Sequence, residues 1–311
     1  MDDALARTRP ANTGVVTLEV LLAHSLDERC GRYIQVLRRI RKNPSEKLVH
    51  DLRVATRRLI STIDLISTVL SDSRLQAIRT ELKNGLKGFN PLRDVQVQLL
   101  TVEQMLPTYP MLEPFHTILL LRERRLVKEI SKHIARVPAE RMEKDVRAAR
   151  KQLRSLFRAP AVHDVAFAAV VGAATIAFAR AVERRSYIDA KKPEAIHRLR
   201  VAFKKVRYTL EALQPVFPGV TQQQLKKMNE YQQLMGDVQD LEVLRVSVNA
   251  YAVRRHKMRD VSLLAVHQEL LRRRDECIRK FLPLADGLFS FWHPEFIPRA
   301  SLELSQSRTR H

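Results

Sequence analysis

The sequence predicts an all-α fold made of two similar halves. Glycine is scarce, at 8 of 311 residues, while residues of high helix propensity such as Ala, Leu, Arg and Glu are abundant. Apolar residues recur at helical spacing between breaks marked by proline. Two segments also read almost alike, 147 positions apart: residues 50–59 are HDLRVATRRL and residues 197–206 are HRLRVAFKKV. A repeat of this kind indicates an internal duplication.

Four helices are expected in the first half, after a loose arm over residues 1–13. Their breaks carry proline or helix-capping residues, as at Pro44, at residues 71–73 and at Pro138. The expected helices cover residues 15–42, residues 44–70, the segment from the 71–73 break to residue 105, and residues 113–137. Short breaks between helices favour antiparallel packing in a bundle.

The charged residues 139–160 leave two interpretations open, a helical connector or part of a long fourth helix. Beyond them the pattern begins again, so the chain divides into a first half over residues 14–138 and a second half over residues 161–282. The second set of helices is expected at residues 161–187, 193–213, 221–256 and 260–282. A tail over residues 283–311 contains an aromatic cluster, which is expected to pack on the bundle: Phe289, Phe291, Trp292 and Phe296.

The formal net charge of +21 predicts a polyanionic partner, because self-repulsion of this size weakens the compact state. Nucleic acid, an anionic membrane surface and a phosphate polymer all fit the composition. The two cysteines, Cys30 and Cys277, form neither a disulfide framework nor a metal-site spacing, which is typical of a reducing cytoplasm. The apolar residues 165–179 are too few to span a bilayer, so we expect a tightly packed core helix and no membrane insertion.

Each copy of the repeated motif predicts an amphipathic helix with a core stripe and a row of cations. The rows contain His50, Arg53, Arg57 and Arg58 in the first copy, and His197, Arg200, Lys204, Lys205 and Arg207 in the second. Most charged helix faces are simply solvated. Here, however, the histidine keeps the same phase as the cations in both copies. An acid also follows each histidine by fourteen residues, Asp64 in one copy and Glu211 in the other.

A row of Arg and Lys side chains on a rigid helix suits the repeated oxygens of a phosphate chain. Arg can bind two oxygens at once, and Lys acts as a point charge. An adjacent polyanion would raise the pKa of a histidine by favouring the imidazolium. Asp94 and Asp240, which belong to a second pair of similar segments at residues 92–97 and 238–243, fit two roles. They either orient the cations or form ordinary salt bridges between helices.

Residues 50–59 and 196–213 resemble the two signature segments of the CHAD family, the conserved histidine α-helical domain. Residues 93–95 and 239–241 are similar to the later motifs of that family. The resemblance covers residues 15–282 and implies two four-helix bundles related by a pseudo-twofold axis. It also implies a basic central channel that binds inorganic polyphosphate. Several members of the family associate with polyphosphate granules in bacteria.

The resemblance implies that the two cation rows line this channel from opposite halves. Arg93, Asp94, Asp240 and Tyr208 would support them. The chain departs from the family pattern at two places: Asn90 and Pro91 stand where a glycine is usual, and Gln239 replaces the arginine of the second later motif.

These features predict a cytoplasmic polyphosphate-binding protein without catalysis, located on or near polyphosphate granules. Paired carboxylates, a Gly-rich phosphate loop and a metal-binding His pair are not evident in the sequence, so we expect no catalytic residue, metal or cofactor. Nucleic-acid binding is the main alternative, since the basic composition permits it, although the cation rows lack interleaved aromatic residues for base stacking. A polyphosphate-processing enzyme is the least favoured reading.

Overall fold

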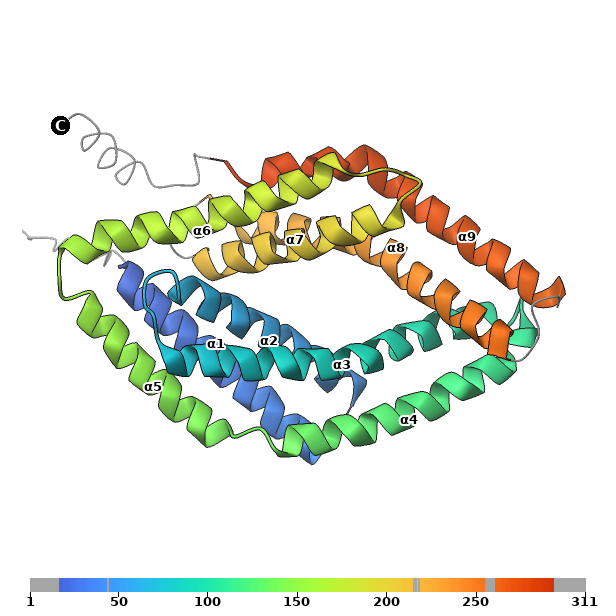
Figure 1. The fold of residues 1–311 in the computed structure, drawn as a ribbon, viewed down its shortest axis with the longest axis horizontal. Helices are drawn as coiled ribbons and strands as arrows, with labels where there is room; N and C mark the ends of the chain where they lie inside the picture. The colour runs from blue at the N-terminus through green and yellow to red at the C-terminus, as the bar shows by residue number, and fades with distance from the viewer. Residues whose placement is uncertain (1–16, 44, 215–216, 218, 255–260, 294–311) are drawn as a thin grey trace, which may run out of the picture.

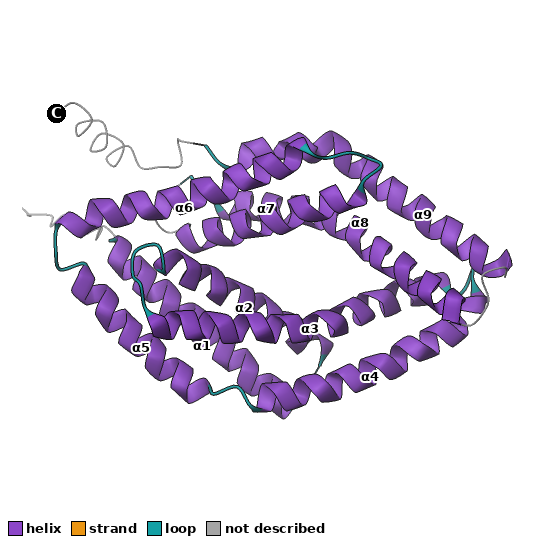
Figure 2. Cartoon of the chain, viewed as in Figure 1, coloured by secondary structure: helices purple, strands orange, loops and turns teal. Residues whose placement is uncertain are grey.

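The structure is a computed structural model that describes residues 17–43, 45–214, 217, 219–254 and 261–293. In chain order (Figure 1) its elements are α1 (Leu18–Lys42), α2 (Glu46–Ile66), α3 (Ser73–Met105), η1 (Pro110–Leu112), α4 (Glu113–Ala135), α5 (Ala139–Leu156), α6 (Ala161–Ser186), α7 (Pro193–Leu213), α8 (Gln222–Arg254), α9 (Val261–Phe281) and η2 (Leu282–Phe291). Every regular element among the described residues is helical (Figure 2), which confirms the all-α class.

Side-chain caps fix where the first three helices begin. The hydroxyls of Thr17 and Ser45 each accept a hydrogen bond from a first-turn N–H group of α1 and α2, both at 3.3 Å. The Asp72 carboxylate accepts two such bonds from α3, at 2.8 and 3.2 Å. These caps satisfy N–H groups that the first turn leaves unpaired. The break expected at residues 71–73 is thus confirmed as a capping segment.

The helices form two groups that meet along α2, α3, α7 and α8 (Figure 1). In the first group α1 packs on α2, α2 on α3, and α3 on α4; in the second, α6 packs on α7, α7 on α8, and α8 on α9. The main contacts between the groups join α2 to α7 and α3 to α8. Because the repeated motifs lie on α2 and α7, the fold brings the two copies together.

The apolar stripe expected on each motif helix is buried. Leu52 and Leu59 of α2, and Leu199 and Val206 of α7, have at most 1% of their surface exposed. Burial of a Leu or Val side chain contributes about 1.5–3 kcal/mol relative to leaving it exposed. The stripes therefore hold α2 and α7 in fixed rotation, with their cation rows turned away from the core.

Residues 139–160 contain a separate helix, α5, and not an extension of α4, which ends at Ala135. This helix packs on α1 and α3 and buries Met142, Val146 and Leu153 against them. The apolar residues recur every three or four positions, so one face of a highly charged helix belongs to the core of the first group.

The aromatic tail packs on the second group of helices, as expected, through two of its four rings. Phe291 and Trp292 are buried against Phe203 and Phe217, with ring centroids 5.4 and 5.8 Å apart. Phe289 is instead exposed, and Phe296 lies outside the described residues.

The apolar helix α6 is not the tightly packed core helix that its composition predicts. Val165 and Ile176 are 65% and 56% exposed, and only 28% of the most apolar 18-residue stretch of α6 is buried. The helix is apolar around its whole circumference, so periodicity could not separate a core face from an open one. By length and composition, α6 is the one helix among the described residues that could cross a membrane. In the structure it packs on α7 and η2.

Candidate functional site

Five cations from three helices lie together where the two groups of helices meet. We call Arg53 and Arg57 of α2, Arg93 of α3, and Arg200 and Lys204 of α7 the cation cluster. A spacing of four residues within α2 and within α7 places each pair on one helix face. The charges act on one another, since the four arginines all lower the pKa of Lys204.

Lys204 loses its charge readily in this setting. Burial is the main cause and, together with the neighbouring arginines, lowers its pKa to about 6. The amine is therefore largely neutral at pH 7 while no anion occupies the cluster. A bound polyanion would favour the ammonium form and restore the charge.

Arg53 is held between α2 and α3. Its side chain is almost fully buried, and Nη1 donates a hydrogen bond of 2.8 Å to the backbone carbonyl of Phe89. Burial, with help from the charges of Arg57 and Arg93, lowers the pKa of Arg53 to about 10. The guanidinium stays charged at neutral pH, so this contact gives the cluster a cation at a fixed position.

Arg200 lies against α8 at Gly236. A Cβ atom at position 236 would stand only 3.3 Å from Nη2 of Arg200, so this glycine makes room for the guanidinium. Burial lowers the pKa of Arg200, and its Nε atom is buried without a hydrogen-bond partner. Sequence analysis missed Gly236. The sequence does carry a signal for this residue, a glycine inside a helix and four positions before Asp240. Glycine inside a helix costs about 1 kcal/mol relative to alanine, so it needs a reason.

Two aspartates accompany the cations. Asp240 of α8 forms an end-on, bidentate pair with Arg93, at 3.2 Å from Nη1 to Oδ1 and 2.8 Å from Nη2 to Oδ2. Burial is the main cause that raises the pKa of Asp94, and the charge of Asp240 adds to it. Asp240 thus forms a salt bridge between α3 and α8 that also orients Arg93, which combines its two expected roles.

The two motif histidines differ in their surroundings. His197 is half-buried, and burial together with the charges of Arg200 and Lys204 lowers its pKa, while a hydrogen bond with Gln239 opposes the shift. A small cavity of about 170 Å³ lies beside His197 and Gln239. His50 is exposed and forms no hydrogen bond or ion pair with the residues that the structure describes.

Arg58 and Lys205, each eight residues after a motif histidine, form ion pairs across the contact between α2 and α7. Nε of Arg58 lies 2.6 Å from Oε1 of Glu211, and Nζ of Lys205 lies 3.3 Å from Oδ2 of Asp64. Each acid stands fourteen residues after the histidine of the opposite copy, so the two pairs are reciprocal. The structure therefore places both cations in the contact between the groups, opposite acids.

Arg207 and Tyr208 pack beside these pairs. The Arg207 guanidinium stacks over the Tyr208 ring at 4.3 Å from its centroid. Nε of Arg207 donates to Gln232 at 3.1 Å, and Nη1 lies 3.8 Å from Glu211. Arg207 is thus partnered on several sides, while the buried Tyr208 lies near Arg53.

The cluster is a concentrated positive site of five cations, and the described acids near it include Asp94, Asp240 and Asp237, whose carboxyl interacts with Arg200. Within the part of the chain that the structure describes, no group of three or more His, Cys, Asp or Glu side chains could hold a metal ion. The chemistry that the arrangement supports is therefore anion binding by guanidinium and ammonium groups.

Comparisons with known proteins identify the family and the fold. A family model described as the CHAD domain matches residues 26–248. The crystal structure of the CHAD domain from the plant Ricinus communis matches with a TM-score of 0.62 and 16% identity, over 90% of this chain and 97% of that chain. PptA from Streptomyces chartreusis matches with a TM-score of 0.55 and 16% identity, over 86% and 99%. The structural matches show a shared fold. The comparison with curated proteins found no significant match.

Proposed function

Because this chain belongs to the CHAD domain family, which is associated with polyphosphate binding, we propose that it binds inorganic polyphosphate at the cation cluster. One observation supports this most directly. Four arginine charges from α2, α3 and α7 act on the half-buried Lys204 and, together with its burial, lower its pKa to about 6. A polymer that carries a negative charge on every unit would relieve that repulsion.

The chemistry of the cluster suits a chain of phosphates better than a single small anion. Arg57 and Arg200 present planar guanidinium groups that can each bind two phosphate oxygens, and Lys204 adds a point charge. Partial burial strengthens these interactions because the local dielectric is lower than that of water. We propose that the two motif helices line a channel along which successive phosphates lie.

We also infer that the two groups of helices arose by internal duplication and are related by a pseudo-twofold axis. Helices α2 and α7 both have 21 residues, and α3 and α8 both have 33. The reciprocal pairs, Arg58 with Glu211 and Lys205 with Asp64, are what such an axis would produce. In this interpretation each group of helices is a four-helix bundle, and α5 is an additional helix of the first group.

The proposed role is binding without catalysis or a cofactor, in the cytoplasm and on polyphosphate granules. Binding at a preformed cluster would let the protein attach to a granule surface through the polymer itself. A granule-bound fraction that disappears when polyphosphate synthesis is blocked is the expected result in cells.

A titration with long-chain polyphosphate tests the site. We expect Arg57→Gln with Lys204→Gln to weaken binding at least about tenfold, since each change removes a charge-assisted contact to phosphate. The control is Lys144→Gln with Lys151→Gln, which removes two cations from the exposed face of α5 and so lowers the net charge at least as much. The control should change the affinity less than about twofold if contacts, and not net charge, dominate.

Single-stranded DNA of equal total charge provides the competitor. Polyphosphate should displace the DNA at moderate salt, because the cluster offers cations without aromatic platforms for bases. If DNA binds as tightly as polyphosphate, or if the two double variants lose affinity equally, the proposed function is wrong and bulk charge explains the binding.

A further inference from the structure

A second cavity, of about 330 Å³, lies within the first group of helices, and no residue of the cation cluster lines it. Its inner wall is apolar and includes the buried side chains of Leu37, Leu52, Leu82 and Phe89. The exposed residues Glu81, Asn84, His133 and Arg136 also line it. Pockets that bind small organic ligands start at about 300 Å³, and an apolar cavity of about 150 Å³ already holds benzene. The space is therefore large enough for a substituted ring.

Aromatic rings stand at the matching positions of the second group. Phe203 occupies the position, counted from the motif histidine, that Thr56 occupies in the first copy. Tyr231 likewise occupies the position, counted from the motif aspartate, that Gly85 occupies. The Phe203 and Tyr231 rings pack edge to face with centroids 4.8 Å apart, and Phe291 adds a third ring. The second group thus fills with its own side chains what the first leaves open.

Thr56 and Gly85 both line the open cavity. A Cβ atom on Gly85 would meet nothing closer than Nε2 of His133 at 3.5 Å, which is ordinary van der Waals contact. Glycine in the middle of α3 costs about 1 kcal/mol relative to alanine, although alanine would fit. The small residues therefore keep a space that the chain could have filled with a gain in stability.

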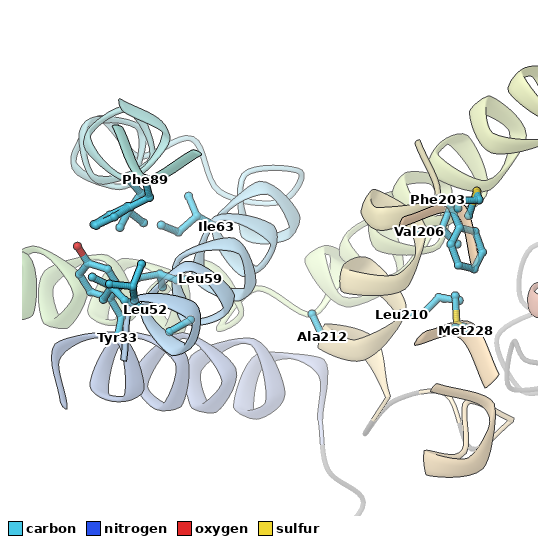
Figure 3. Close-up of a cluster of buried hydrophobic side chains, with 14 of the residues drawn as sticks. Tyr33, Leu52, Leu59, Ile63, Phe89, Phe203, Val206, Leu210, Ala212 and Met228 are labelled. Carbon is cyan, nitrogen blue, oxygen red and sulfur yellow. The ribbon is translucent and has the colours of Figure 1, made fainter. Parts of the chain in front are cut away.

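Tyr33 supplies a polar group in this apolar space. The side chain is 5% exposed and lines the cavity, and its hydroxyl forms no hydrogen bond with any described residue. Figure 3 shows the Tyr33 ring beside Leu52, with its hydroxyl oxygen directed toward Phe89. Burial raises the pKa of Tyr33, so the hydroxyl stays protonated and can donate. The Tyr231 hydroxyl, by contrast, donates to the Ala285 carbonyl at 2.8 Å.

We propose that this cavity binds a small neutral aromatic molecule that accepts a hydrogen bond from Tyr33. The buried, apolar part of the wall disfavours a charged ligand beside Tyr33, because burial of an unpaired charge is costly. The Phe89 ring lies on the wall and can meet a ligand ring edge to face, as Phe203 meets Tyr231 in the second group. The Tyr33 hydroxyl lines the cavity without a partner among the described residues, so a ligand acceptor can take this hydrogen bond in place of water.

Two probes of the same shape test the proposal on the full chain. Acetophenone carries a carbonyl acceptor, and α-methylstyrene replaces that oxygen with a methylene group. We expect saturable binding of acetophenone in a ligand-observed NMR titration, with a dissociation constant on the order of 1 mM for a fragment of this size. Tyr33→Phe should weaken acetophenone about fivefold, the effect of one hydrogen bond, and leave α-methylstyrene unchanged.

A filled variant provides the second test. Thr56→Phe with Gly85→Tyr copies the aromatic residues of the second group into the first, and we expect it to bind neither probe while its polyphosphate affinity stays unchanged. If the filled variant does not fold, the binding of the two probes to Tyr33→Phe still tests the proposal. The proposal is overturned if acetophenone shows no saturable binding to the wild type, if the filled variant binds it equally, or if Tyr33→Phe weakens both probes alike.

Discussion

At the scale of single residues, burial decides what the motif cations can do. Arg53, Arg200 and Lys204 occur in the same sequence pattern as Arg58 and Lys205. Arg53 is buried and Arg200 and Lys204 are half-buried, however, whereas Arg58 and Lys205 face acids. Arginine keeps its charge in such a site because its ordinary pKa is far above neutrality, but lysine does not. Lys204 is therefore the residue at which we expect the proposed anion binding to be linked to proton binding.

We predict that polyphosphate affinity falls as pH rises from about 6 to 8. Lys204 has a pKa of about 6 in the free protein, and a bound anion raises it, so binding takes up a proton above pH 6. Calorimetry in buffers of different ionisation enthalpy measures this uptake. Lys204→Arg should remove most of the slope, because the new side chain stays charged. His197 also has a lowered pKa, so His197→Gln serves as the control. An unchanged slope in Lys204→Arg would contradict the assignment of the proton uptake to Lys204.

The same lysine should make stability depend on pH in the absence of ligand. Its pKa is lower in the folded than in the unfolded chain, so the unfolded chain binds more protons between about pH 6 and 10.5. Its contribution to the free energy of unfolding therefore rises with pH across this window and is least favourable below pH 6. Chemical denaturation at several pH values should show a flatter profile for Lys204→Met than for the wild type; parallel profiles would contradict the prediction.

At the scale of elements, reciprocal ion pairs hold α2 against α7. Glu211 is largely buried and faces Arg29, Arg58 and Arg207, so it neutralises one cation on each motif helix and one on α1. Asp64 does the same for Lys205 and for Arg79 of α3. A carboxylate that serves several cations matters more than an exposed pair, because its removal leaves buried positive charge uncompensated.

We expect Glu211→Gln to lower the free energy of unfolding by about 1–3 kcal/mol, since three cations lose their counter-charge. The control is Glu143→Gln, which breaks the more exposed pair with Arg38 at 3.1 Å and should cost less than about 1 kcal/mol. Urea denaturation compares the two variants. Equal losses would mean that the α2–α7 pairs behave as ordinary surface salt bridges.

Helix α5 allows a second test at this scale. Leu153→Ala removes a side chain that is 1% exposed and should cost about 2–5 kcal/mol if α5 belongs to the core of the first group. Leu121→Ala on α4, where the side chain is 60% exposed, is the matched control and should change stability by less than about 0.5 kcal/mol. A small effect at Leu153 would indicate that α5 is only loosely attached.

At the scale of the whole molecule, the net charge of +21 and the cation cluster act in different ways. The distributed charge attracts any polyanion over long range, and salt screens that attraction. The cluster acts through contacts at fixed positions between two groups of helices. Specific binding should therefore depend on the cluster, and the rate of encounter on the overall charge.

Salt dependence separates these two contributions. The logarithm of the polyphosphate binding constant should fall linearly with the logarithm of the salt concentration. Arg57→Gln with Lys204→Gln should reduce the steepness of that line by about 1–2, because cations in contact with phosphates no longer release counterions. Lys144→Gln with Lys151→Gln should leave it nearly unchanged. Equal reductions would contradict a localised site.

The sequence alone determined the all-α class, the capped break at residues 71–73 and the burial of the stripes on both motif helices. These features depend on local chemistry, namely helix propensity, proline, side-chain caps and a period of 3.6 residues. The same local chemistry determined on which face of its helix each cation row lies. Sequence analysis misjudged α6, because a helix that is apolar on all sides carries no periodic signal, and it left α5 undecided because so few of its residues are apolar.

Only the tertiary structure decided which cations gather and which find acids. Arg57, Arg93 and Lys204 come from three helices, and their meeting depends on how α2, α3 and α7 pack. Asp64 and Glu211 were visible in the sequence as a repeated acid, but their partners lie on the opposite motif helix. A helical pattern fixes the direction in which a side chain points from its own axis, whereas packing between helices fixes what it meets there.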